Sequence, residues 1–390
     1  MDMRTTVAFV AMWVAVLGLG CDDGGGEHVD AGGGVDAHVD AAGDSGGEVD
    51  GGGVDSGSTD GGVDAGGPVA TSVTVQVQPG SAAAGTERVN FGLPLARGAL
   101  TDASLIVVRH EGSEVAASRR GLASWPDGSL RSVQLQIDLP AEATELVVDI
   151  GTAPTAAPLS EVPVADTLTD GEPRMWALLP ATWLAGSGFA GPLVDDAAIA
   201  GTPLDAWGSV CDYDRHDTDA FLEGSDARGV WLFDRVTAMV RGYARSGERS
   251  PLRSAYREAT LYREGLTGSP TDIRIGVPGA SDDLKYHYTQ GLALHYLLTG
   301  DDRFREAAEA VGARAAALWT SPGWAGGADF WTERHAGFGL LAYVWAAAVS
   351  DDRAGEFETL ADEAVTAYLD IQATYPIGYA DAEARCFAHH

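Results

Sequence analysis

The stretch SDDLKYHYTQGLALHYLLTGDDR, residues 281–303, places proton-transferring and anion-binding side chains directly before an apolar run. Lys285, the only lysine of the chain, is followed by Tyr286, His287 and Tyr288. Imidazole and phenol groups are common acids and bases of catalysis, and an ammonium group binds anions. No further charge appears until the aspartates near the end of the stretch, as is typical of a buried helix. We therefore expect a buried helix whose first turn borders a functional site.

A second copy of this pattern follows after about 50 residues, which indicates internal repetition. Aligning Gly291 with Gly339 also places His287 under His335. The second copy adds further candidate site residues, namely Trp331, Glu333, Arg334 and His335. An earlier segment, GVWLFDRVTAMV, contributes Asp234 and Arg235 at the corresponding place.

Helical segments in the second half alternate between almost uncharged and highly charged sequences. The pairs are 229–240 with 250–265, 286–298 with 301–318, and 335–349 with 351–371. A helix that is apolar on all sides must be buried, whereas an amphipathic partner can face water. The linkers TGDDR and SDDR carry the helix-stop and N-cap chemistry that a helical hairpin needs. The sequence predicts α/α-hairpin repeats over 228–390 as a partial toroid, with the inner-helix N-termini gathered at one rim.

In the region 71–160, polar and apolar residues alternate as they do in β-strands, beginning with SVTVQVQ. Several short strands separated by Gly, Pro and Asp predict an all-β barrel or sandwich. The WPDGS sequence at 125–129 predicts a tight turn, and Trp125 is expected to be a core residue beside it rather than a sugar-stacking platform. A connecting segment at 161–227 completes the expected fold class, a β domain followed by an α domain.

The N-terminus reads as a targeting segment. Residues 1–21 carry Arg4, an apolar stretch and a final Cys21, as in a lipoprotein signal whose cysteine is lipid-modified. Residues 22–70 are rich in Gly and Asp, lack Lys and Arg, and predict a disordered tether. We expect an extracytoplasmic protein anchored to a membrane through Cys21. Cys211 and Cys386 either pair there or remain thiols.

The formal net charge of −32 over 390 residues argues against a nucleic-acid partner. One acidic loop at 211–221 raises the question of calcium, because it clusters carboxylates around His216 (Asp212, Asp214, Asp217 and Asp219). The spacing lacks the glycine and distal glutamate of an EF-hand. A solvated acidic loop is the preferred interpretation, and no cofactor is expected.

Several motifs together resemble one known family. VNFGLPLARGAL, LASWPDGSLRSVQLQ, LPATWL, GVWLFDR, KYHYTQGLALHYLLTGD and RHAGFGLLAYV are similar to the exo-rhamnogalacturonan lyase-like proteins, over about 85–375. The resemblance implies a RIFT-type β-barrel joined to an α/α toroid, and a carbohydrate-active protein that cleaves a uronate glycan by β-elimination. A closed toroid needs more hairpins than the three visible here, which suggests a truncated or open version.

For such a lyase, a cation must neutralise the C6 carboxylate, a base must take the C5 proton and an acid must protonate the leaving oxygen. Lys285 and Arg334 suit the first role. His287 suits the base, because a helix N-terminus disfavours the imidazolium; Tyr286 or Tyr288 suits the acid. The remaining expected site residues are His335, which can exchange roles with the base, and the substrate contacts Arg235, Gln290, Trp331 and Glu333.

Structural alternatives stay open for these residues. His295 is expected to be a core histidine, and Asp234 with Arg235 a structural feature. Glycoside hydrolysis by Asp283 and Glu333 is a second enzymatic hypothesis, because two carboxylates near one rim suit it. A non-catalytic glycan-binding protein or decayed paralogue is the third hypothesis.

Overall fold

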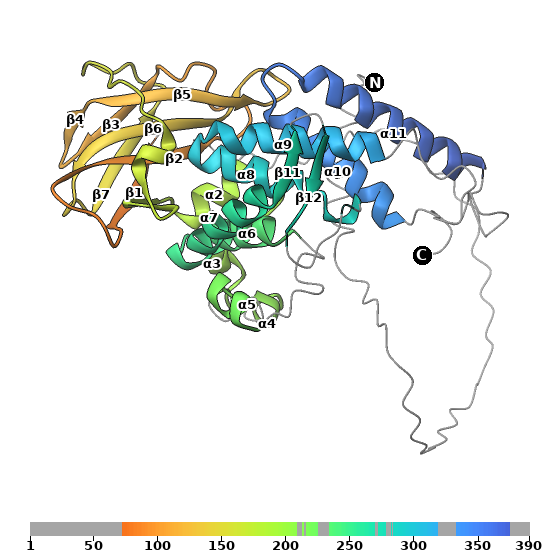
Figure 1. Cartoon of the computed structure of the whole chain (residues 1–390). Helices are drawn as coiled ribbons and strands as arrows, with labels where there is room; N and C mark the ends of the chain where they lie inside the picture. The colour runs from red at the N-terminus through yellow and green to blue at the C-terminus, as the bar shows by residue number, and fades with distance from the viewer. Residues whose placement is uncertain are drawn as a thin grey trace, which may run out of the picture. The chain divides into compact units, whose positions relative to one another are not determined.

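A computed structural model describes residues 72–208, 213, 216–224, 234–269, 272–277, 282, 284–318 and 333–374 (Figure 1). All of these residues belong to one compact unit of the chain. The expected signal, the tether and all three cysteines lie outside the described residues. None of the described helices is both long and apolar enough to span a membrane.

The first half is built of antiparallel strands in two sheets. The larger sheet has the order β10-β1-β7-β3-β4 and the smaller one β2-β6-β5. The strands are β1 (Ser72–Pro79), β2 (Thr86–Pro94), β3 (Ile106–His110), β4 (Ser113–Val115), β5 (Ala117–Ser124), β6 (Leu130–Pro140), β7 (Glu145–Ile150) and β10 (Met175–Leu178). Within the described residues the two sheets are not joined into one closed sheet. β10 comes from the predicted connecting segment and pairs with β1, so the β structure extends past residue 160.

Alternating hydrophobicity explains these strands. In β1, Val73, Val75 and Val77 are buried while the residues between them face outward. The tight turn predicted at 125–129 is confirmed. The Trp125 amide donates to the Ser129 carbonyl, and Gly128 adopts a φ of 85°, which glycine tolerates.

Short elements link the sheets to the helices. They are η1 (Val164–Thr167), β8 (Leu168–Thr169), β9 (Glu172–Pro173), α2 (Ala181–Ser187), α3 (Asp196–Ile199), α4 (Asp205–Gly208) and α5 (Thr218–Gly224). Further on, β11 (Leu266–Ser269) and β12 (Asp272–Ile275) form a small hairpin, and η2 (Leu284–Tyr286) precedes the central helix.

Longer helices follow in adjacent pairs. They are α6 (Arg235–Ser246), α7 (Arg249–Glu264), α8 (Thr289–Thr299), α9 (Asp302–Leu318), α10 (Glu333–Val349) and α11 (Ala354–Thr374). α6 packs on α7, α8 on α9, and α10 on α11. Every residue of α8 is buried, as its uncharged sequence requires. The expected toroid and its internal repetition stay predictions.

The smaller sheet packs on α8, and its polar side chains bond the last carbonyls of that helix. Asn90 Nδ2 donates to the Thr299 carbonyl at 2.8 Å, and Ser132 Oγ donates to the Leu297 carbonyl at 2.6 Å. Gln134 Nε2 donates to Asn90 Oδ1 at 2.7 Å. The final carbonyls of a helix have no partner within the helix. The strands therefore complete the hydrogen bonding of the C-terminal end of α8.

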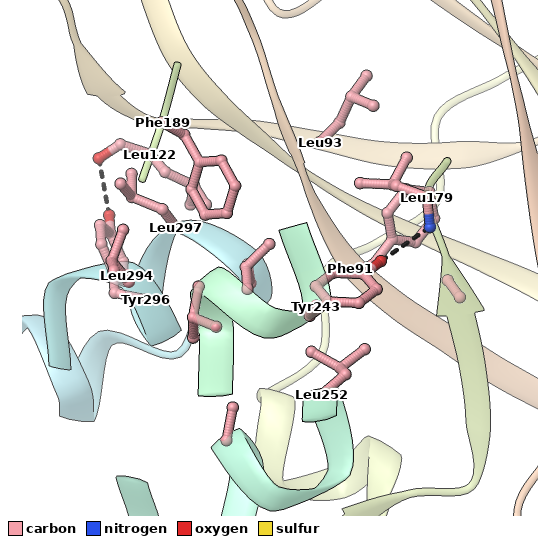
Figure 2. Packing of buried hydrophobic residues seen from close by; sticks show 14 of the residues in the cluster. Phe91, Leu93, Leu122, Leu179, Phe189, Tyr243, Leu252, Leu294, Tyr296 and Leu297 are labelled. Carbon is pink, nitrogen blue, oxygen red and sulfur yellow. Dashed lines mark hydrogen bonds between the residues drawn. The ribbon is translucent and has the colours of Figure 1, made fainter. Parts of the chain in front are cut away.

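Apolar side chains from sheet and helices form a continuous core at this junction (Figure 2). Leu294 and Leu297 of α8 lie near Leu122 of β5, and the Tyr296 hydroxyl donates to the Leu122 carbonyl at 2.8 Å. The Tyr243 hydroxyl accepts the backbone N–H of Leu179 at 2.8 Å. The β region and the helices thus share one core.

Candidate functional site

The N-terminal ends of α6 and α8 meet, whereas the expected toroid rim stays a prediction. The Asp234 carboxylate caps α6 by accepting the Thr237 amide at 3.0 Å, and it also accepts the Gly291 amide of α8 at 2.8 Å. A Cβ on Gly291 would lie 2.6 Å from Asp234 Oδ1, so only glycine permits this approach. Burial raises the pKa of Asp234, although its hydrogen bonds oppose the shift. Asp234 therefore acts as a structural link between the two helices.

The N-terminal end of α10 also belongs to this rim. Tyr288 packs edge-on against Phe338 of α10, with ring centroids 5.9 Å apart. Glu333, Arg334 and His335 begin α10, but their side chains lie outside the described residues. Trp331 and Asp283 also lie outside the described residues.

The residues around the start of α8 are either buried or half-buried. His287 is 2% exposed, Tyr288 3% and Gln290 7%, whereas Lys285 and Tyr286 are half-buried. The Lys285 ammonium lies 5.5 Å from the ring centroid of Tyr286. A ligand that approaches from solvent therefore meets Lys285 and Tyr286 first.

The backbone of this turn is fixed from α7. The Tyr262 hydroxyl donates to the Tyr286 carbonyl and accepts the Tyr288 amide at 3.0 Å. Tyr262 itself is 1% exposed, and burial raises its pKa above the usual range, so it remains protonated. The backbone of Tyr286 is thus fixed by a buried hydrogen bond, and its side chain also packs against the core.

Beside this turn lies a group that we call the Asp282 cluster: Asp282, Arg274, Arg314 and His287. The Asp282 carboxylate pairs with Arg314, lies 3.4 Å from Arg274 Nε and lies 3.7 Å from His287 Nε2. The sequence had not singled out Asp282 or the two arginines. The arginines come from β12 and α9, and only tertiary packing brings them to the rim.

Arg235 contacts a buried carboxylate instead of facing the rim. Its guanidinium binds both oxygens of Glu258 at 2.8 and 3.0 Å, and Glu258 is fully buried in α7. The guanidinium also covers the ring of Phe221 at 3.9 Å. Its Nε and Nη2 donors are used within the protein, which supports a structural role for Arg235, and the expected substrate contact stays a prediction.

The acidic loop shows carboxylates that already have protein partners. Asp217 accepts the Ala220 amide at 2.8 Å at the start of α5, and Asp219 pairs with Arg257 at 2.7 Å. The hydrogen bond from Arg257 lowers the pKa of Asp219. Asp212 and Asp214 lie outside the described residues.

Trp125 is half-buried, and one face of its ring is covered. The Arg131 guanidinium lies 4.3 Å from the Trp125 centroid and 4.9 Å from that of Trp345 in α10. The indole N–H of Trp125 donates to the Leu95 carbonyl at 2.9 Å. Burial lowers the pKa of Arg131 to about 10, so the guanidinium still carries its charge at neutral pH. By contacting both rings, Arg131 links Trp125 of the β region to Trp345 of α10.

A cavity of about 280 Å³ lies near the other end of α8, where sequence reasoning had expected only core. His295 is buried as expected, at 3% exposure, but it also lines this cavity. Tyr256 and Asp301 line it too. The sequence carries no signal for it, because its walls come from three separate parts of the chain.

His295 should make the protein sensitive to mild acid. Burial lowers its pKa to about 4 from an ordinary value of 6.5, so the unfolded chain binds this proton more readily than the folded one. Stability should therefore fall as the pH drops from 6.5 towards 4, by at most about 3 kcal/mol for this group. Urea unfolding at several pH values should show a shallower pH dependence in His295→Gln. An unchanged slope in that variant would contradict the prediction.

Comparison with known proteins supports the β region. Residues 71–146 match the PcRGLX-like N-terminal RIFT barrel domain. This stretch covers β1, β2 and the greater part of the two sheets. The match supports membership of the rhamnogalacturonan lyase-like family at the level of this domain. No curated protein and no solved structure matches the chain. The domain indicates a carbohydrate-active protein that binds polysaccharide.

Proposed function

We propose that this protein is a polysaccharide lyase that cleaves uronate-containing, pectic-type glycans by β-elimination. The observation that carries the proposal is the RIFT barrel match at residues 71–146, the domain that stands first in this lyase-like family. The half-buried Lys285 and Tyr286 beside the Asp282 cluster offer a place for the chemistry.

The roles follow from exposure and charge. Lys285 would neutralise the C6 carboxylate, which makes the C5 proton more acidic. Tyr286 would exchange the proton with C5 or with the leaving oxygen, because its phenol lies next to that cation. His287 is buried beside Asp282, so it would position the turn rather than touch the sugar. Elimination breaks the C4–O bond and leaves a C4–C5 double bond.

The test follows ultraviolet absorbance of the unsaturated uronate while the purified full chain acts on rhamnogalacturonan or polygalacturonate. We expect the rate to fall about 100-fold or more in Lys285→Ala and in Tyr286→Phe. Arg97→Ala and Tyr368→Phe are the matched controls, since Arg97 pairs with exposed Asp127 and Tyr368 bonds the Ala336 carbonyl. Wild-type rates in Lys285→Ala and Tyr286→Phe would contradict this site.

Non-catalytic glycan binding is the second candidate, and the burial of His287 and Tyr288 favours it. A flat absorbance trace from folded protein that still binds the polysaccharide would decide for it. Saturated rather than unsaturated products would instead decide for glycoside hydrolysis.

We further propose that the chain is a lipoprotein anchored through Cys21 outside the cytoplasm. The apolar stretch before Cys21 and the acidic Gly-rich segment after it support this. Mass spectrometry of the mature N-terminus should find an acylated Cys21. An unmodified N-terminus, or cleavage at another residue, would contradict the anchor.

A further inference from the structure

The cavity near the C-terminal end of α8 is separate from the rim. His287 precedes α8, whereas His295 lies six residues after Thr289, the first residue of that helix, or about 9 Å further along its axis. The walls come from the segment 164–171, from α7, and from the junction of α8 with α9. All of the lining residues belong to the described part of the chain. The cavity can thus be occupied without any contact to Lys285 or Tyr286.

The size of the cavity limits its ligand. Its volume of about 280 Å³ lies just below the range of about 300–1,000 Å³ that is usual for drug-sized ligands. Tyr256 and Phe304 add apolar surface beside His295, with ring centroids 4.8 and 4.1 Å from the imidazole. One small ring with an apolar face fits this space better than an oligomer.

Neutral hydrogen-bonding groups line the same space. His295 is uncharged at neutral pH, so its imidazole offers one donor and one acceptor. Burial raises the pKa of Tyr256, so its hydroxyl also stays neutral. Thr260 adds a second hydroxyl from the next turn of α7. Within the described residues, no hydrogen bond occupies the His295 imidazole or the Tyr256 hydroxyl.

The charged groups of the wall argue against an anionic ligand. Asp301 is 4% exposed, and its carboxylate binds Arg303 in a bidentate pair at 2.6 and 2.9 Å. Burial raises the pKa of Asp301, but the bonds from Arg303 outweigh it, so the carboxylate is ionised. Asp170 and Glu264 add further negative charge against Arg263. Because Arg303 neutralises Asp301, the two carboxylates of Asp170 and Glu264 remain against the single cation Arg263.

We propose that this cavity binds one uncharged monosaccharide unit, with Tyr256 and His295 bonding its hydroxyl groups. The cavity wall combines aromatic side chains with neutral donors and acceptors, and a pyranose ring offers apolar C–H groups and hydroxyl groups that match both. This inference rests on the carbohydrate-binding part of the proposed function and is independent of elimination at the rim.

The experiment measures binding of neutral monosaccharides to the purified full chain by saturation-transfer NMR and calorimetry. The panel contains galactose, glucose, xylose and rhamnose, with galacturonate as the charged comparison. Tyr256→Phe removes one hydroxyl and should weaken binding about fivefold. Thr260→Phe should fill the cavity and abolish binding. Tyr243→Phe, another buried tyrosine, is the matched control and should keep wild-type affinity.

Circular dichroism confirms that each variant is folded, and Lys285→Ala separates the two sites. Sugar binding that persists in Lys285→Ala but is lost in Thr260→Phe supports the cavity even if the lyase assay stays flat. Three results would overturn the proposal: no neutral sugar binds the wild type, Thr260→Phe binds normally, or galacturonate binds more tightly than every neutral sugar. Lyase activity with no monosaccharide binding would refute sugar binding in the cavity without contradicting the proposed site at Lys285 and Tyr286.

Discussion

Arg235→Met is expected to lower the free energy of unfolding by about 3–5 kcal/mol, because it leaves the buried Glu258 carboxylate without its charge partner. Glu258 has no solvent exposure, and the guanidinium of Arg235 binds both of its oxygens. Thr218 Oγ1 donates to Glu258 at 3.0 Å and cannot replace a cation. Urea unfolding followed by circular dichroism measures the loss.

The double variant Arg235→Met with Glu258→Leu tests the cause. Removing both charges eliminates the unpaired carboxylate, so we expect most of the lost stability to return. Glu258→Leu alone is the complementary control, since it leaves Arg235 half-buried with access to water. A double variant no more stable than Arg235→Met would show that the ion pair is not the cause.

The pH dependence of Arg235→Met gives a second readout. Burial raises the pKa of Glu258 above 4.5, and Arg235 opposes that shift. Without Arg235 this opposition is lost, so the pKa of Glu258 in the folded state rises further above that in the unfolded state. The variant should therefore gain more stability than the wild type as the pH falls from neutrality towards 4.5. If Arg235→Met instead loses little stability but no longer binds glycan, Arg235 contacts the substrate, as the sequence predicted.

Gly92→Ala is expected to destabilise the protein by about 3 kcal/mol or more, at the upper end of overpacking effects. A Cβ at this position of β2 would lie 2.0 Å from the Leu297 carbonyl oxygen of α8 and 2.9 Å from two backbone carbons. Backbone atoms cannot move aside as a flexible side chain can. Strand and helix would have to separate, which would also strain the neighbouring bonds from Asn90 and Ser132.

Gly186→Ala is the matched control. Gly186 lies exposed in α2, and a Cβ there would meet no heavy atom within 4 Å. Alanine should stabilise this helix by about 0.5–1 kcal/mol. Thermal and urea unfolding of the two variants should give opposite signs. A Gly92→Ala loss below about 1 kcal/mol would mean that α8 can shift away from β2 at little cost.

Local patterns in the sequence predicted the elements better than their contacts. The alternation in SVTVQVQ indicated β1, and the uncharged run after Tyr286 indicated the buried α8, because each pattern reports on one element at a time. The pairing of β10 with β1 was not visible, since it joins residues about 100 positions apart. The same limit applies to Arg274 and Arg314, which reach Asp282 only through packing.

The predicted site stays a prediction, and the structure shows only which of its expected residues lie near one another. The N-termini of α6 and α8 do meet, through Asp234 and Gly291. The burial of His287 was missed, because a histidine in a polar first turn carries no sign of how deep the turn lies. The role of Arg235 was decided by Glu258, a residue on another helix that no local pattern connects to it.

The hydrogen bonds from Asn90, Ser132 and Gln134 to the end of α8 limit how the strand region could be exchanged between proteins. A boundary drawn at residue 160 divides the sequence between strands and helices, but it separates polar groups from the carbonyls they serve. Exchange of the strand region between proteins would therefore succeed only when the receiving helix ends in the same way. The strand sheet and the C-terminal end of α8 thus form one hydrogen-bonded unit.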